Sequence, residues 1–285
     1  MSGWVYFLVP LVLGLGLLAL FAWRAFMGKR EPGYLSLTEY WIYSSQIRLP
    51  DQTHLMDRMI SSNPHNRPGK PCIGAREGLL FTDVRLHTAV ALKDKNPTFF
   101  RPDLFEEDVE PTKEILGRLA KCGALVKVRY ASEARLKDFR HLQFVPHMVD
   151  AIAEFMEGSV VFDHVSERIW TAEEFRGFLE RNGNCERPEA HVRVVWKTDE
   201  DGSYARTYGM RKIGMDELRT DPQEDDREVL MVGLLTRLAF QLFRKPDELG
   251  PFEFDEYGDV FILEIGERDA TGRRVNVRRR QVVSG

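Results

Sequence analysis

The chain has little cysteine and none of the common sequence signatures of catalysis. Its three cysteines, Cys72, Cys122 and Cys185, are far apart and odd in number. This pattern excludes a disulfide framework and is typical of a reducing compartment. No GxSxG, P-loop, GxGxxG, HExxH or paired CxxC pattern occurs in the sequence. These absences predict no bound cofactor and no metal centre, and they favour a protein that is not an enzyme.

Charged residues are missing from the beginning of the chain. Residues Trp4 to Trp23 form an uninterrupted uncharged run. A helix of this length spans about 30 Å at about 1.5 Å per residue, which is the thickness of a bilayer's hydrocarbon core. The run is longer than the core of a cleaved signal peptide and has no basic residue before it, and it is too apolar on every face for a core helix. We therefore expect a retained transmembrane helix.

The flanks of this run predict its orientation. Aromatic side chains of the kind that anchor helices at membrane interfaces lie near both ends: Trp4, Tyr6 and Trp23. Basic residues follow the run at once: Arg24, Lys29 and Arg30. The positive-inside rule places these cations on the cytoplasmic side. The sequence therefore predicts a single-pass protein of the inner (cytoplasmic) membrane, with its N-terminus outside and its C-terminal domain in the cytoplasm.

Three regions are expected along the chain: a transmembrane anchor over 1–27, a juxtamembrane segment of helices and loop over 28–76, and a cytoplasmic α+β domain over 77–285. Residues 36–62 are predicted to form two short helices separated at Pro50, with Asp51 capping the second. The aromatic cluster at Tyr40, Trp41 and Tyr43 lies just after the membrane. We expect it at the lipid headgroups, in the core or against a partner.

The main domain mixes strands and helices in an irregular order. Helices are expected at 112–121, 143–157, 171–181 and 229–243, and strands at 84–92, 124–130, 159–162, 168–170, 191–197, 204–208, 259–266 and 274–283. Thr112 is the expected cap of the first helix, and Thr171 begins a capping box. Hairpins are expected around Asp201-Gly202 and around residues 270–272. The order predicts an α+β fold with a mixed or largely antiparallel sheet and helices on one face, preceded by one N-terminal transmembrane helix.

Basic residues alternate along three predicted strands, where they form the pairs Arg85 and His87, Lys127 and Arg129, and His191 and Arg193. Alternation puts each pair on one face of its strand. If the strands are neighbours, that face could bind a phosphate-bearing ligand, a lipid headgroup or a partner's acidic segment. The alternative is a solvated face. Its cations would then pair with local carboxylates such as Asp83, Glu133 or Asp199.

Two further groups of reactive side chains are weaker candidates. His147, Asp150 and Glu154 share one face of a predicted helix and could bind a metal. Apolar residues occupy the opposite face of that helix, so these three are expected at the surface. His65 and Cys72 lie in one loop and could act as a base and a nucleophile, but no third group marks a catalytic site.

Charge is distributed unevenly between the body and the end of the chain. Residues 268–285 contain six arginines and one acid, although the whole chain has a net charge of −4. The basic end could lie on anionic lipid or could form the last strand, paired against Glu264 and Glu267. The remainder is acidic, so we expect no nucleic-acid partner.

Several blocks of the main domain resemble a family of bacterial domains. They are DVRLHTAVALKDKNPTFFRPDLFEED at 83–108, LVKVRYASE at 125–133, HLQFVPHMVDAIAEF at 141–155 and RTYGMRKIGMDEL at 206–218. The family is catalogued as of unknown function. The resemblance covers about residues 77–265 and implies a prokaryotic source and a single domain. It implies no catalytic residue.

These observations lead to two functional hypotheses. In the first, the cytoplasmic domain is a non-catalytic interaction or accessory module, for example a subunit of a membrane complex. Its expected partners are the lipid bilayer and a protein at or near the membrane. In the second, the chain is a membrane-tethered enzyme or sensor that binds an anionic small molecule on the basic sheet face.

Overall fold

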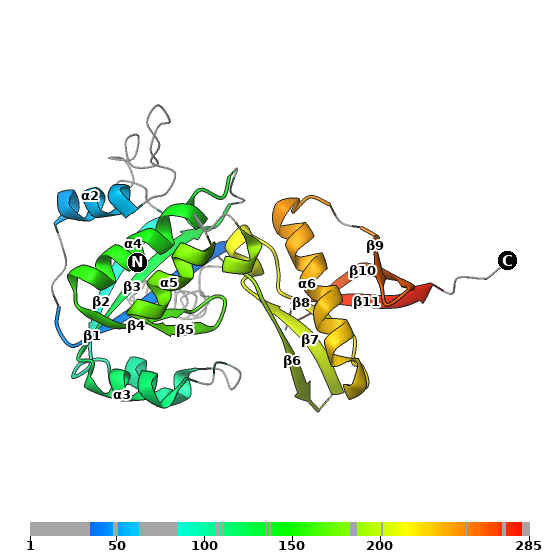
Figure 1. Ribbon diagram of the computed structural model, residues 1–285, viewed down its shortest axis with the longest axis horizontal. Helices are drawn as coiled ribbons and strands as arrows, with labels where there is room; N and C mark the ends of the chain where they lie inside the picture. Colours follow the sequence, from blue (N-terminus) through cyan, green and yellow to red (C-terminus); the bar gives the residue numbers. More distant parts are fainter. Residues whose placement is uncertain are drawn as a thin grey trace, which may run out of the picture. The chain divides into compact units, whose positions relative to one another are not determined.

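The computed structural model describes residues 35–47, 51–62, 85–105, 109, 111–134, 136, 138–182, 187–200, 202–248, 250–269 and 272–280 (Figure 1). The predicted anchor and the loop over 63–76 lie outside these residues. Within the described part of the chain, no helix combines the length and the apolar character needed to cross a membrane.

The described residues form an α+β fold with two largely antiparallel sheets and five α-helices, which confirms the predicted class. The first sheet has the strand order β2-β3-β1-β4-β5, and all its pairings are antiparallel. Its strands are β1 (Ser36–Ser44), β2 (Leu86–Leu92), β3 (Ala124–Ser132), β4 (Gly158–Asp163) and β5 (Arg168–Thr171).

Strand β1 occupies the centre of this sheet, so the helix predicted at the start of 36–62 is wrong. β1 pairs with β3 on one side and with β4 on the other. Tyr40 and Ile42 are buried on one face, and Trp41 and Tyr43 are buried on the other. A strand that is buried on both faces shows no polar alternation, and its aromatic residues suit a sheet. The aromatic cluster therefore lies in the core.

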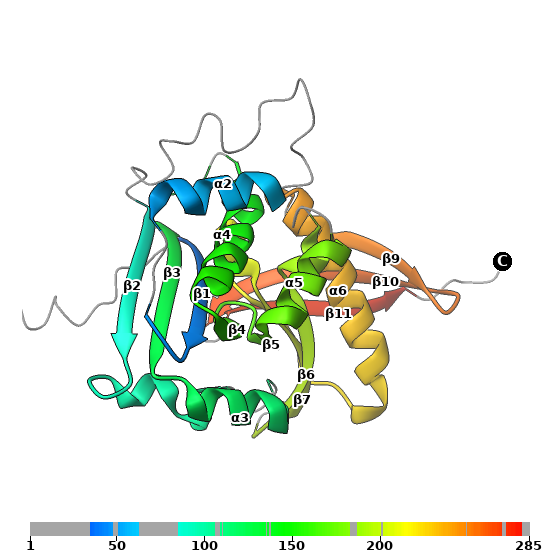
Figure 2. The ribbon, with the colours of Figure 1, turned by 60° about the vertical axis from the view of Figure 1, so that its left-hand side comes forward.

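Helices cover both faces of the first sheet, whereas the sequence predicted helices on one face. The Tyr40 face packs against α2 (Gln52–Ser62), α4 (His141–Phe155) and α5 (Ala172–Asn182). The Trp41 face packs against α3 (Lys113–Lys121) and the 3₁₀ turn η2 (Pro97–Phe100). Because both faces of the central strands are apolar, each face needs a covering layer. Figure 2 shows α2 and α3 at opposite ends of β2.

The second sheet has the strand order β6-β7-β8-β11-β10-β9. Its strands are β6 (Arg193–Asp199), β7 (Gly202–Tyr208), β8 (Leu218–Thr220), β9 (Phe252–Glu256), β10 (Asp259–Asp269) and β11 (Gly272–Arg280). Helix α6 (Glu228–Arg244) covers one face and contributes seven buried residues to the core there. The other 3₁₀ turns are η3 (Pro102–Leu104), η5 (Pro188–Ala190), η6 (Met210–Ile213) and η7 (Asp225–Arg227).

The predicted caps begin their helices as expected. The Asp51 carboxylate accepts hydrogen bonds from the backbone amides of Thr53 and His54, both at 3.0 Å. The Thr112 hydroxyl accepts one from the amide of Ile115. At α5, the amide of Glu174 donates to the Thr171 hydroxyl at 3.1 Å, and the amide of Thr171 donates to the Glu174 carboxylate at 2.8 Å. This reciprocal pair is the predicted capping box.

Candidate functional site

The six basic residues predicted to form one face are divided between the two sheets. Strands β2 and β3 are neighbours, and His87 lies directly opposite Arg129. Strand β6, which carries Arg193, belongs to the second sheet. His191 precedes β6, is fully buried and stacks on the ring of Phe243, with 5.7 Å between the ring centroids. The expected single cationic lattice is therefore not formed.

The cations of the first sheet contact groups of their own domain. The Arg129 guanidinium donates to the carboxylate of Glu39, which also accepts a 2.6 Å hydrogen bond from the Trp41 indole. Although burial alone would raise it, these two hydrogen bonds hold the pKa of Glu39 below its usual value. The Lys127 ammonium lies 4.1 Å from the ring of Trp41 and 3.5 Å from that of Phe99. Its burial there lowers the pKa of Lys127.

The remaining predicted cations also have local contacts. Arg85 lies over the ring of Tyr130, at 5.4 Å from its centroid. The Arg193 guanidinium donates a 2.6 Å hydrogen bond to the backbone carbonyl of Glu167 and lies 5.8 Å from the ring of Tyr208. Of the carboxylates suggested as partners, Asp83 lies outside the described residues. Anion binding at these six positions stays a prediction.

Two of the three polar residues of α4 are buried, so the prediction of a solvated face is wrong for His147 and Asp150 and holds for Glu154, which is exposed. His147 and Asp150 are 7% and 4% exposed because α2 and α5 pack against this face. Asp150 accepts from Arg58 at 3.4 Å and from Arg176 at 3.1 Å. Glu154 accepts from the same two arginines, at 2.8 and 2.9 Å. The result is an ion-pair network that joins three helices.

The remaining predictions concern the cysteines, the anchor residues and metal binding. Cys122 is buried in the core beside α3, as expected for a small apolar residue. The anchor residues, His65, Cys72 and Cys185 lie outside the described residues. Among the residues that the structure describes, no group of three or more histidine, cysteine or acidic side chains is placed to hold a metal ion.

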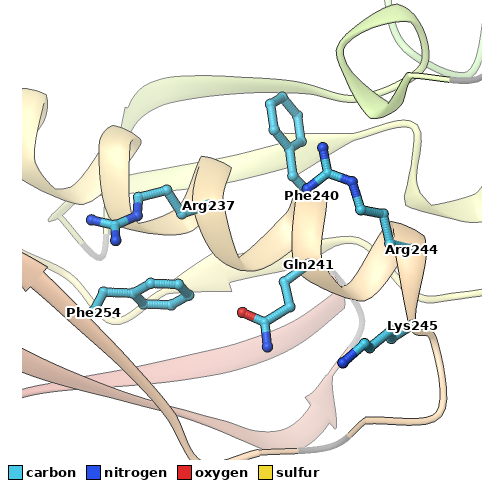
Figure 3. Close-up of a pocket in the computed structure, with 6 residues that line it drawn as sticks. All are labelled: Arg237, Phe240, Gln241, Arg244, Lys245 and Phe254. Carbon is cyan, nitrogen blue, oxygen red and sulfur yellow. The ribbon is translucent and has the colours of Figure 1, made fainter.

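The strongest candidate site is a pocket between α6 and β9 that sequence reasoning did not identify. Its volume is about 450 Å³, within the range typical of small-molecule sites. Figure 3 shows the residues that line it: Arg237, Phe240, Gln241, Arg244, Lys245 and Phe254. Three of these six side chains are cationic and two are aromatic. We call this site the α6 pocket.

The last two turns of α6 and the residue that follows them form the polar side of the α6 pocket. Arg237 and Gln241 are four residues apart and share one face of α6. Lys245 comes directly after the helix, which ends at Arg244. In Figure 3 these three side chains extend to the side of the helix on which Phe254 lies. Phe254 comes from β9, and its ring centroid is 4.8 Å from the Arg237 guanidinium. The α6 pocket therefore has a cation on each side of Gln241, Arg237 and Lys245, and the ring of Phe254 forms an apolar wall.

Carboxylates balance part of this charge. The Arg237 guanidinium donates to Glu256 at 2.7 Å and to the backbone carbonyl of Asp255 at 2.9 Å. The Lys245 ammonium lies 3.7 Å from a carboxylate oxygen of Glu248, and both side chains are well exposed. Arg244 has no carboxylate within ion-pair distance in the described part of the chain. Arg237 is thus fixed by the fold, whereas Lys245 and Arg244 are available to an anion.

These residue types favour binding over catalysis. Arginine and lysine donate to carboxylate and phosphate oxygens, and phenylalanine provides apolar contact area. Among the described residues that line the pocket there is no hydroxyl or thiol nucleophile, no histidine and no carboxylate. A cation near the C-terminal end of α6 also stabilises the helix dipole, which accounts for the position of Arg244 and Lys245 without a ligand. It does not account for the aromatic wall opposite them.

A signal for the α6 pocket exists in the sequence. Residues 229–243 are apolar around most of the helix, so the stripe of Arg237, Gln241 and Arg244 is its polar face, and Lys245 follows directly after it. That stripe is readable from helical periodicity. The aromatic wall is not readable, because the position of Phe254 opposite α6 depends on the pairing of β9 with β10.

Comparisons with known proteins give no assignment for this arrangement. No protein-family model matches the chain, and neither the curated proteins nor the solved structures give a match. The resemblance of its sequence blocks to bacterial domains therefore stays an expectation.

Proposed function

We propose that the chain is a single-pass membrane protein whose cytoplasmic domain is a non-catalytic binding module. The uncharged run at Trp4–Trp23 and the cations that follow it support an inner-membrane anchor with the N-terminus outside. The folded domain would then work at the cytoplasmic face as an accessory protein or as a subunit of a membrane complex.

The ligand of this module is a small anion with an apolar body, held in the α6 pocket. The observation that carries this proposal is the row of Arg237, Gln241 and Lys245 facing the ring of Phe254. A carboxylate or phosphate group of the ligand would take the place of Glu248 as the partner of Lys245, because the present ion pair is exposed. Such exposed pairs contribute little, about 0–1 kcal/mol, so their displacement costs little.

A membrane-tethered enzyme or sensor for the same class of anion is the second candidate. The basic sheet face that first suggested it is divided between two sheets, and its cations in the first sheet contact Glu39 and aromatic rings. The α6 pocket replaces it as the anion site. Because the described residues of its lining include no general acid or base besides Lys245, the binding role is the better supported of the two.

The anion proposal is tested by thermal unfolding of the full chain in mild detergent. The probes are 1-naphthyl phosphate, its neutral analogue 1-naphthol and inorganic phosphate. We expect 1-naphthyl phosphate to raise the unfolding temperature more than either fragment, since a ligand that binds only the folded state stabilises it. Equal effects of the charged and neutral probes would contradict the proposal.

The membrane proposal is tested separately by reporter fusions after Gly285. One reporter is active only in the cytoplasm and the other only after export. We expect activity of the cytoplasmic reporter alone. Purification in mild detergent tests the accessory role, because a subunit should bring a stoichiometric partner, and a chain that purifies alone would count against it.

A further inference from the structure

The two sheets have four edge strands, and three of them are protected against pairing with another chain. Strand β5 has only four residues. Strand β6 carries Arg193, Lys197 and Asp199, and β9 has three acids in five residues. Short length and charged side chains are the usual means by which proteins protect sheet edges.

Strand β2, the fourth edge, has none of these protections. It runs for seven residues, LHTAVAL, with no acidic residue, lysine, arginine, proline or glycine. Four consecutive residues, His87 to Val90, are exposed, and Val90 is 42% exposed. Figure 2 shows β2 as the outermost strand of the first sheet. Residues of this kind on an open edge are suited to accept another strand.

The backbone of β2 presents its open hydrogen-bonding groups at alternate residues. The Arg85 carbonyl accepts from the amide of Ala131 at 2.9 Å, and the Lys93 amide donates to Gly123 at 3.0 Å. Odd-numbered residues of β2 therefore face β3. The amides and carbonyls of Thr88 and Val90 face outward, where the described residues provide no neighbouring strand.

The charges around this edge select the kind of partner. Three cations, Arg85, Lys93 and Lys95, lie beside β2 among residues 85–96, against one acid, Asp94. A second copy that paired with the whole of β2 in antiparallel register, Leu86 opposite Leu92, would bring Arg85 opposite Lys93. Like charges in opposed positions are destabilising. An extended acidic segment would instead be attracted.

We propose that β2 is the docking strand for an extended acidic segment of a protein partner, which adds to the first sheet beside Thr88 and Val90. Main-chain hydrogen bonds provide the attachment, and the flanking cations provide selectivity for carboxylates. This site is independent of the α6 pocket, which lies on the second sheet.

The probe is a fluorescent peptide that alternates valine with glutamate, titrated into the full chain in mild detergent. Two control peptides have lysine in place of glutamate, or methyl groups on alternate backbone amides. We expect the acidic peptide to bind, and both controls to bind at least about tenfold more weakly, because each control peptide loses several of the contacts that hold the acidic one. Equal binding of the lysine peptide would overturn the choice of partner.

Amide hydrogen exchange locates the peptide. Exchange at Thr88 and Val90 should slow when the peptide is bound, while Ala89, whose amide already faces β3, should not change. Val90→Pro removes one outward amide without removing a bond to β3, since proline is tolerated at such edge positions. Loss of this one hydrogen bond should weaken binding of the peptide about fivefold. Thr88→Pro is the second variant if Val90→Pro does not fold.

A variant of the other site is the matched control. Lys245→Met lies in the α6 pocket and should bind the peptide as the unchanged chain does. The proposal is overturned if the folded proline variants bind the peptide equally well. It is also overturned if the unchanged chain dimerises without peptide and Val90→Pro abolishes the dimer, because β2 would then pair with a second copy.

Discussion

The ammonium group of Lys212 and the carboxylate of Asp163 form an ion pair in which both side chains are completely buried. Lys212 belongs to η6, beside the second sheet, and Asp163 ends β4 of the first sheet. The backbone carbonyl of Lys212 also accepts from the Ser36 hydroxyl at 2.8 Å and lies 3.1 Å from Nε2 of His141. This cluster connects the cores of the two sheets.

Removal of one partner of this pair should destabilise the protein strongly. Lys212→Met leaves the Asp163 carboxylate buried and without its counter-ion, a change that typically costs about 3–5 kcal/mol. Guanidinium unfolding of the full chain, followed by tryptophan fluorescence, measures the loss. The double variant Lys212→Met and Asp163→Asn should recover part of it, because a neutral amide in place of the carboxylate leaves no buried charge. A loss below about 1 kcal/mol for Lys212→Met would contradict the burial of the pair.

His141 should make stability depend on pH. Burial is the main cause that lowers its pKa to about 4, from a usual value of 6.5. The unfolded chain therefore binds a proton more readily than the folded one, and stability should fall as pH decreases from about 6.5 to about 4. The loss amounts to about 3 kcal/mol for a shift of this size.

The variant His141→Gln isolates this effect. It keeps a donor toward the Lys212 carbonyl but cannot be protonated, so its stability should vary less with pH between about 4 and 6.5. Lys212 lowers the pKa of Asp163, although burial alone would raise it. Asp163 therefore changes stability only as the pH falls below its usual pKa of 3.8, outside the range of this comparison. Parallel pH profiles for the two proteins would show that His141 is not the responsible group.

The two carboxylates of α4 should differ in their contribution to stability. Asp150 is 6% exposed at its side chain and Glu154 is 44% exposed, although both accept from Arg58 and Arg176. Asp150→Ala removes the buried acceptor of both arginines and should cost about 1–3 kcal/mol. Glu154→Ala should cost less than about 1 kcal/mol, since exposed pairs are screened. Guanidinium unfolding measures the free energy that each variant loses. Equal losses for the two variants would contradict the difference in burial between Asp150 and Glu154.

Local signals in the sequence predicted most helices and the closing hairpin. Thr112, Thr171 and Asp51 begin helices because a side-chain oxygen that satisfies free amides is a local requirement. The basic end of the chain forms β11, in which Arg278 pairs with Glu264 at 3.4 Å, so the strand alternative applies to its described residues.

Features that depend on tertiary contacts differ from what the sequence predicts. The sequence predicts a helix at β1 because burial on both faces leaves no polar alternation that would indicate a strand. It predicts Asp150 at the surface because the periodicity of α4 does not show that α2 and α5 pack against this side chain. Likewise, β6 and β2 carry similar basic patterns, and nothing local in either strand shows that they belong to different sheets.

The most direct test of the account is a calorimetric titration of the full chain with 1-naphthyl phosphate, compared with the variant Arg244→Gln/Lys245→Met. Arg237 is left unchanged because its bonds to Asp255 and Glu256 fix β9. Arg140→Gln, an exposed cation at the start of α4, is a control. We predict binding that weakens at least about tenfold in the double variant and not in the control. Unchanged affinity in a folded double variant would contradict the α6 pocket as the anion site.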